Sequence, residues 1–338
     1  MLSDAPGVHT HYEFEKTLRE AASKVDFKNL KNFSAWSICY NKNMKFEDVE
    51  AARREYWGKF RKALLVSVFS LILVSTPAFI FSPLFMAPIV GFVIIVIAIV
   101  FALVISKDRA AYHKAYKAYF VEQSLHKIFT DVSYDRQKGL PASLLAATGM
   151  INTGDDYNSN DLTIAKYKNI SFSQADVQIQ TESTDSDGHT TYTTIFKGRF
   201  MIFEFPKKFD FKLELIGKKF HAYRVPGKDE AISRKMSKVK TESEDFNRAF
   251  KIYGQDGYET FYLLDPAMIA RIEDISDFYK NKILIGFYDN KILVALDDGK
   301  DSFEPPRASK PINEAEEMKK VASSIKIITD FVDVISSH

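Results

Sequence analysis

Residues Ala63–Phe81 read ALLVSVFSLILVSTPAFIF, and residues Leu84–Ile105 read LFMAPIVGFVIIVIAIVFALVI. Neither stretch contains an ionisable side chain, and each is close to the roughly 20 residues with which an α-helix crosses about 30 Å of hydrocarbon. Helices buried in a soluble domain, the alternative explanation, rarely stay apolar on every side over this length. The sequence therefore predicts two membrane spans, at about 63–81 and 84–105.

The connection between the two spans, Ser82-Pro83, is so short that the spans must form an antiparallel hairpin with both chain ends on one side of the membrane. Basic residues flank the hairpin and are absent from its turn, and such an excess marks the cytoplasmic side. We therefore expect both termini in the cytoplasm. Because transporters usually place ionisable groups within the membrane, the hairpin is typical of an anchor. The flanking basic residues are Arg53, Arg54, Lys59, Arg61, Lys62, Lys107, Arg109, Lys114 and Lys117.

The composition of the 338-residue chain limits the classes of partner. Its 46 basic and 44 acidic residues give a net charge of +2, so the chain as a whole offers no electrostatic case for nucleic acid. Cys39 is the single cysteine, which excludes an internal disulfide and a cysteine-rich metal site. The lipid bilayer is the partner that the sequence predicts, and nucleic acid is not expected.

Helical patterns flank the predicted spans on both sides. Residues 1–45 are predicted to form an amphipathic helix, over about Tyr12–Leu30, and a loop. A second helix is expected to begin near Phe46 and to enter the first span, with Arg53 interrupting its apolar face. Past the second span, aromatic residues from Tyr112 to Phe129 continue the helix. Residues 46–130 are thus predicted to be a transmembrane hairpin whose cytoplasmic extensions pack as an antiparallel stalk.

Residues 140–306 change in character and predict a cytoplasmic α+β domain. Alternating apolar residues within Asp161–Gln180 and β-branched and aromatic residues within Thr190–Phe205 predict two strands, joined as a hairpin through the turn-forming Ser183–His189. Helices and strands are intermixed, but there are few β-α-β signals. The sequence therefore favours an antiparallel sheet.

Three shorter patterns complete the predicted α+β domain. Lys212–Ile216 and His221–Val225 are candidate strands. Asp265-Pro266 supplies an N-cap and an N1 proline for a helix. Lys282–Tyr288 and Lys291–Leu296, joined through Asp289-Asn290, are predicted to form a hairpin.

A C-terminal amphipathic helix is predicted over residues 313–336. Its apolar residues repeat at alternating intervals of three and four, which is the spacing of a heptad seam. Such a face packs either on the chain's own helices or on a second copy or protein partner, and both alternatives remain open. The face consists of Met318, Val321, Ile325, Ile328, Val332 and Ile335.

Basic residues outnumber acidic ones between Lys207 and Lys240. A domain tethered at an anionic leaflet can gain about 1 kcal/mol for each basic residue near the surface. The alternative is a solvated segment balanced by acidic neighbours such as Glu242 and Glu244. The candidate lipid-facing cluster is Lys207, Lys208, Lys212, Lys218, Lys219 and Arg224.

No recognisable catalytic motif occurs in the sequence, and we expect no catalytic residue, no cofactor and no metal. Asp155-Asp156 and Asp297-Asp298 are paired carboxylates in turn-like settings, which are more often solvated loops than active sites. Asp185-Ser186-Asp187-Gly188 has the first letters of a calcium loop but lacks its downstream acidic ligand. Whether the chain is an enzyme is left open, and a non-enzymatic role is favoured.

Four segments, taken in their order along the chain, resemble sequences of a bacterial membrane-protein family with a domain of unknown function, DUF3137. They are FKGRFMIFEF (Phe196–Phe205), EDFNRAF (Glu244–Phe250), YLLDPAMIARI (Tyr262–Ile272) and Ile283–Pro305, which ends in DSFEP. The resemblance covers roughly residues 50–306 and leaves out the basic segment and the C-terminal helix. It implies a bacterial cytoplasmic membrane protein with a twin-span hairpin, and it assigns no catalytic residue or ligand.

Three functions follow as hypotheses. The leading one is a non-enzymatic, membrane-anchored cytoplasmic module that binds a protein partner or organises a membrane complex. The second is recognition of anionic lipid headgroups through the basic segment 207–240. The third is an enzyme that acts on a membrane-proximal substrate.

Overall fold

The computed structural model describes residues 44–80, 83–224, 236–254 and 263–336. The predicted N-terminal helix over Tyr12–Leu30 and the turn residue Ser82 lie outside these ranges. The described chain divides into two compact units. A helical unit comprises residues up to 127 together with 303–323, and an α+β unit comprises 128–302 together with 324–336.

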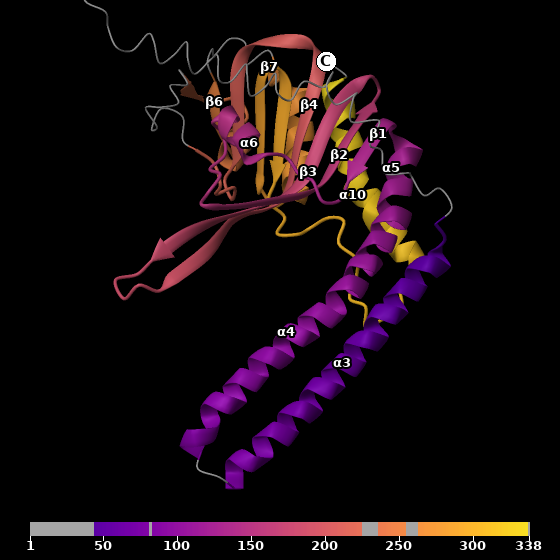
Figure 1. The fold of residues 1–338 in the computed structure, drawn as a ribbon. Coiled ribbons are helices and arrows are strands. Elements are labelled where there is room, and N and C mark those ends of the chain that lie inside the picture. Colours follow the sequence, from indigo (N-terminus) through magenta and orange to yellow (C-terminus); the bar gives the residue numbers. More distant parts are fainter. Residues whose placement is uncertain (1–43, 81–82, 225–235, 255–262, 337–338) are drawn as a thin grey trace, which may run out of the picture. The chain divides into compact units, whose positions relative to one another are not determined.

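Two long helices, α3 (Phe46–Ile80) and α4 (Pro83–Tyr116), lie side by side in the helical unit (Figure 1). The predicted start of a helix at Phe46 is therefore confirmed. Among the described residues, one helical stretch, Val90–Ile128, is long and apolar enough to cross a membrane. Large apolar side chains are exposed on both helices, including Leu65, Phe69 and Leu103.

The parts of these helices outside the predicted spans pack against each other through aromatic rings, as the sequence predicts. The Tyr56 and Tyr112 rings stack with their centroids 6.2 Å apart, and the Phe46 and Phe120 rings meet edge to face at 6.3 Å. Beyond α4 the helix continues through a π-helical stretch, η2 (Lys117–Glu122), into α5 (Gln123–Ile128). A π-helical turn inserts an extra residue and so rotates the helix face that follows.

Arg53, which interrupts the apolar face of α3, has a structural role in the helical unit. Its side chain is 7% exposed and pairs with Glu50 on the same helix at 2.6 Å. Its Nη1 also donates to the carbonyl oxygen of Ala308. A buried guanidinium requires such partners. The arginine thereby fastens the segment after Phe303 to α3.

The described strands form a seven-stranded sheet in the order β1-β2-β3-β4-β6-β5, with β7 paired to β4 (Figure 1). Every pairing is antiparallel, which confirms the predicted α+β class with an antiparallel sheet. The strands are β1 (Thr130–Asp135), β2 (Asp156–Tyr167), β3 (Ile170–Thr184), β4 (Thr190–Gly217), β5 (Ser237–Val239), β6 (Phe250–Gly254) and β7 (Ile283–Leu296).

Two local predictions in this unit are confirmed. Strands β3 and β4 form the predicted hairpin, and their last pair before the turn is Thr184 opposite Thr190. Helix α9 (Pro266–Phe278) begins at the predicted N-cap, where the Asp265 carboxylate accepts a hydrogen bond from the Met268 amide at 2.7 Å. The cap residue and the N1 proline together fix the start of this helix.

Two strand predictions are wrong. Residues 283–296 form a single strand, β7, that pairs with β4 along its length, and not a hairpin. Asp289 adopts a left-handed φ of 50°, opposite an irregular stretch of β4 between Glu204 and Leu213. The turn signal Asp289-Asn290 therefore coincides with an irregularity in the pairing of β4 and β7. The described part of the predicted strand His221–Val225, residues 221–224, also forms no strand: within it Tyr223 makes an isolated bridge, to Ile151.

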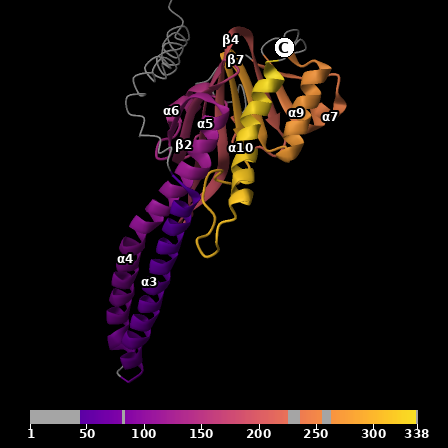
Figure 2. The ribbon, with the colours of Figure 1, turned by 90° about the vertical axis from the view of Figure 1, so that its right-hand side faces the viewer.

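The two faces of the sheet carry different layers. One face holds an apolar cluster that includes Val177, Phe200 and Leu293 and is covered by α6 (Ala142–Thr148). On the other face the Phe203 ring lies 6.3 Å from that of Phe331 in the C-terminal half of α10 (Glu314–Ile335). Helices α7 (Glu244–Ala249) and α9 lie beside each other (Figure 2). The candidate site lies on the face that α10 covers.

Candidate functional site

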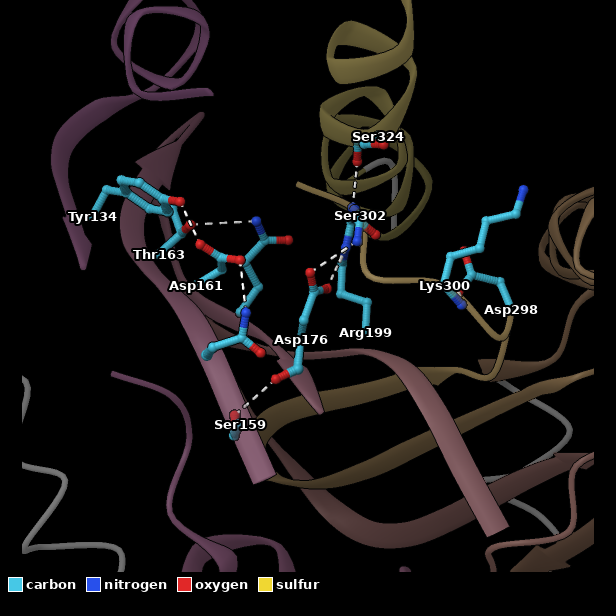
Figure 3. Close-up of polar contacts among 12 residues, drawn as sticks. Tyr134, Ser159, Asp161, Thr163, Asp176, Arg199, Asp298, Lys300, Ser302 and Ser324 are labelled. Atoms are coloured by element: carbon cyan, nitrogen blue, oxygen red, sulfur yellow. Dashed lines mark hydrogen bonds and ion pairs between the residues drawn. The ribbon is translucent and has the colours of Figure 1, made fainter. Parts of the chain in front are cut away.

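A group of buried polar residues lies on strands β2, β3 and β4 (Figure 3). Asp176 on β3 pairs in register with Asn160 on β2 and with Arg199 on β4. Side chains alternate between the faces of a strand, so Gln174 shares a face with Asp176. Gln174 is paired in register with Thr163. Five strand positions on two adjacent rungs are thus polar where a sheet interior is normally apolar.

Asp161 reaches this face because of a bulge. The register of β2 and β3 shifts between Asn160 and Thr163, and Asp161 has a left-handed φ of 58°. Aspartate tolerates this conformation better than most residues. Its carboxylate accepts hydrogen bonds from the Tyr134 hydroxyl and, at 2.9 Å, from the Asn160 amide nitrogen. The bulge and these two donors hold the carboxylate toward Asp176.

Asp176 and Arg199 connect the sheet to the segments that cover it. Asp176 Oδ2 accepts a hydrogen bond of 2.9 Å from the backbone amide of Ser302. Arg199 Nε lies 4.0 Å from Asp176 Oδ1, and Arg199 Nη1 donates to the carbonyl oxygen of Ser324 in α10 (Figure 3). The guanidinium is therefore shared between a carboxylate and a helix carbonyl.

A third carboxylate, Asp301, joins the site from the loop after β7. One oxygen of each of Asp161, Asp176 and Asp301 lies within 4.8 Å of the others. Asp161 and Asp176 are 1% and 5% exposed. Burial raises the pKa of Asp176 well above its usual range, and the negative charges of Asp301 and Asp161 raise it further, whereas Arg199 lowers it. The site therefore gathers three carboxylates beside a guanidinium that also contacts α10.

Two acceptor atoms at this site are buried without a hydrogen-bond donor. They are Gln174 Oε1 and Asp301 Oδ1. The nitrogen of the Gln174 amide donates to Thr163 Oγ1 at 3.4 Å, which fixes the amide on the rung next to Asp161 and Asp176. Buried acceptors normally have a partner. The arrangement can therefore do one of two things: share a proton between carboxyl groups, or hold a cation.

Sequence reasoning missed all of these residues. The available signals were a polar pair, Gln174 and Asp176, two positions apart within the predicted strand, and Arg199 inside FKGRFMIFEF. Asp301 begins the DSFEP segment. The contribution of Asp161 depends on a bulge, which alternation alone does not reveal.

The carboxylate pairs that the sequence did single out lie elsewhere. Asp155 and Asp156 are exposed. Asp297 accepts a hydrogen bond from the Lys197 amide at 3.2 Å and so has a structural contact. In the loop that resembles the start of a calcium site, Asp185 Oδ1 accepts from the amides of Asp187 and His189 at 3.0 and 2.8 Å. The Asp185 carboxylate therefore stabilises the turn between β3 and β4 through these backbone hydrogen bonds.

The apolar face of the C-terminal helix is buried within the chain. Val321, Ile325, Ile328 and Val332 are each 0% exposed. Met318 is half-buried, with its sulfur 4.0 Å from Ser124 Oγ. The side chain of Ile335 lies outside the described residues. The described part of this face is therefore occupied by intramolecular packing.

The basic cluster is distributed along β4 and the segment after it. Lys208, Lys212, Lys218 and Lys219 are exposed, and Arg224 is half-buried. Lys208 pairs with Asp289 at 3.2 Å. The side chain of Lys207 lies outside the described residues. Lys208 and Lys218 are ten residues apart, which corresponds to up to about 33 Å of strand, so the cluster is an extended row.

The comparisons with known proteins support the family resemblance. Residues 194–336 match the family described as "Protein of unknown function (DUF3137)". The match begins within β4 and extends through α10, so it includes the basic segment and the C-terminal helix, which the resemblance in the sequence leaves out. No curated protein matches the chain.

A search of solved structures finds the crystal structure of the mycobacterial trehalose monomycolate transport factor A, TtfA. The two chains are 8% identical, and the match covers 66% of this chain and 93% of that one. The TM-score of 0.34 is too low to support an argument about shared fold or function.

Proposed function

We propose that this chain is a non-enzymatic module that two membrane spans hold at the cytoplasmic face of a bacterial membrane, where it binds a protein partner. The observation that carries the membrane part is the apolar surface of both α3 and α4. Phe69 and Leu73 on α3 are 70% and 63% exposed, and Phe92 and Leu103 on α4 are 68% and 69% exposed. A contiguous apolar surface of this kind is unfavourable in water and favourable in hydrocarbon.

The apolar surface ends at charged groups, where α3 and α4 pass from the predicted spans into the aromatic extensions. Lys59 on α3 pairs with Asp108 on α4 at 2.8 Å and with Glu55 at 2.9 Å. These groups lie outside the predicted spans, at the level where the helices would leave the hydrocarbon. With the basic residues that flank both spans, they support a cytoplasmic location for both chain ends.

Single-cysteine labelling tests this topology. In a Cys39→Ser background, a cysteine is introduced either at Ser82, between the spans, or at Ser186, in the exposed β3–β4 turn. A membrane-impermeant maleimide is added to intact spheroplasts. We expect labelling of Ser82→Cys in intact spheroplasts and labelling of Ser186→Cys only after lysis. Recovery of the protein in the soluble fraction, or the reverse labelling pattern, would contradict the proposal.

The outer part of the β3–β4 hairpin supports a binding role. Residues 181–184 pair with 190–193, and within the described structure no strand pairs with the outer edge of β4 before Arg199. Figure 1 shows this hairpin extending beyond the rest of the sheet. An exposed strand edge can accept an added strand from another chain. We infer that a protein partner with an extended segment binds there.

Recognition of anionic lipid headgroups is a second candidate and has less support. Lys212, Lys218 and Lys219 are exposed, as this function requires, but the row is extended and Lys208 already has an acidic partner. Salt-sensitive binding of the detergent-purified chain to anionic vesicles would favour it. Equal binding to neutral vesicles would exclude it.

A further inference from the structure

The spacing of the three buried carboxylates matches the coordination sphere of one ion. The oxygens of Asp161, Asp176 and Asp301 lie within 4.8 Å of one another. Oxygens bound to one Ca²⁺ at about 2.3–2.6 Å are at most about 5 Å apart. The three carboxylates are therefore close enough together to bind one calcium ion.

The guanidinium beside these carboxylates is shared with another group. Arg199 is 3% exposed and lies 4.0 Å from one carboxylate, Asp176, while its Nη1 donates to the Ser324 carbonyl. This ion pair joins Arg199 to one of the three carboxylates that lie together. Burying ionised carboxylates without compensation is strongly unfavourable, so the site requires either protons or a further cation.

An independent observation favours the cation. Gln174 is 1% exposed, and its Oε1 has no hydrogen-bond donor. It occupies the rung next to Asp161 and Asp176 on the same face, and its amide nitrogen is engaged by Thr163. A proton shared between carboxyl groups would leave this amide oxygen without a partner. A hard cation would satisfy it, because Ca²⁺ accepts side-chain amide oxygens as well as carboxylates.

We propose that Asp161, Asp176 and Asp301 bind one divalent cation of the size of Ca²⁺, with Gln174 Oε1 as an additional oxygen ligand. Asp161 and Asp176 come from adjacent strands, and Asp301 comes from the loop that follows β7. The ion would therefore tie this loop to the sheet. Asp301 is the more exposed member of the group and would be the point of entry.

Calcium titration of the full-length protein in detergent tests the proposal. The chain is stripped with EDTA and titrated with CaCl₂, and binding is followed by calorimetry and by the thermal unfolding midpoint. We expect saturable binding of one ion and a rise in the midpoint, because a ligand specific for the native state stabilises it. Absence of saturable binding would overturn the proposal.

Asp301→Asn is the decisive variant, and Asp274→Asn, at an exposed position of α9, is its matched control. Asp301→Asn keeps the side-chain volume and removes a ligand charge. We expect it to weaken Ca²⁺ binding by about tenfold or more, whereas the control binds as the wild type does. Equal affinity in the two variants would overturn the assignment of the ion to this site.

A second measurement covers the case in which Asp301→Asn does not fold. Tb³⁺ replaces Ca²⁺ at oxygen sites and emits when a nearby tyrosine is excited, and the Tyr134 hydroxyl donates to Asp161. We expect sensitised emission that Ca²⁺ displaces and that falls in Tyr134→Phe. Emission that is unchanged in Tyr134→Phe would place the ion elsewhere and overturn the proposal.

Discussion

Arg199 and Asp176 lie opposite each other on β4 and β3, with Nε 4.0 Å from Oδ1, and the same guanidinium donates to the Ser324 carbonyl. Both side chains are buried. One cation therefore connects two strands of the sheet with the helix that covers them. Because it contacts a carboxylate and a helix carbonyl together, its loss affects both layers of the α+β unit.

Replacement of Arg199 by methionine keeps the apolar stem and removes the charge. We expect Arg199→Met to destabilise the protein by about 3 kcal/mol, because the change removes both the donor to the Ser324 carbonyl and the positive charge beside Asp176. The measurement is thermal unfolding of the full chain in detergent. Arg248→Met, at an exposed position of α7, is the control and should change stability by less than about 0.5 kcal/mol. Equal midpoints for the two variants would show that Arg199 does not compensate the carboxylates.

The raised pKa of Asp176 predicts how stability depends on pH. Above the ordinary value of 3.8, the unfolded carboxyl loses its proton while the buried one retains it. The native state then binds more protons than the unfolded state, so stability falls as the pH rises toward the raised pKa. Asp176→Asn should remove this decline. The measurement is the unfolding midpoint in EDTA from pH 5 upward, and a wild-type profile parallel to that of the variant would contradict the prediction.

The sequence predicts the elements whose signals are local. The cap Asp265 with Pro266, the turn between β3 and β4, and the aromatic repeat from Tyr112 onward each act within a few residues, and each is confirmed. Element type follows from short-range chemistry, so these predictions do not require knowledge of the tertiary fold.

The errors and omissions have a common physical cause. Asp289-Asn290 carries the local chemistry of a turn, but pairing along β4 makes it part of one strand. The cluster of three carboxylates consists of Asp161, Asp176 and Asp301, which come from three separate parts of the chain. A bulge orients Asp161. Register and bulges depend on the whole sheet, so a local pattern does not specify them.

Glu304 is expected to stabilise the helical unit above acidic pH. Its carboxylate lies 3.1 Å from both His113 Nδ1 and Lys117 Nζ, and the hydrogen bond to His113 and the charge of Lys117 lower its pKa from 4.5 to about 2. A carboxyl with a lowered pKa contributes stability above pH 4.5 that is lost as the pH falls toward 2.

Glu304→Gln measures this contribution. We expect a loss of about 1 kcal/mol at neutral pH, a small value because solvent screens a carboxylate that is 36% exposed. The difference in unfolding midpoint between Glu304→Gln and the wild type should shrink as the pH falls from 4.5 toward 2. Glu316→Gln, at an exposed position of α10, is the control. A difference that does not change over this range would contradict the ion-pair origin of the effect.

The β3–β4 hairpin is expected to be the place where a protein partner binds. Tyr192 on β4 is 54% exposed and lies where no described strand pairs with the outer edge of β4. A photoreactive phenylalanine analogue at Tyr192 should crosslink to a second polypeptide in intact cells. The same analogue at Phe278, which is 75% exposed on α9, is the control.

If the partner binds by adding a strand to β4, the crosslink should also depend on the backbone amides of β4. An added strand forms hydrogen bonds with backbone amides of β4, and proline has no amide hydrogen to donate. Thr191→Pro and Thr190→Pro alter neighbouring amides that point to opposite sides of the strand, so only one of them lies on the outer edge. We expect the proline variant on the outer edge to lose the crosslink, and the other variant to give a higher crosslink yield. Retention of the full crosslink in both variants would mean that the partner contacts side chains of the hairpin and does not extend its sheet.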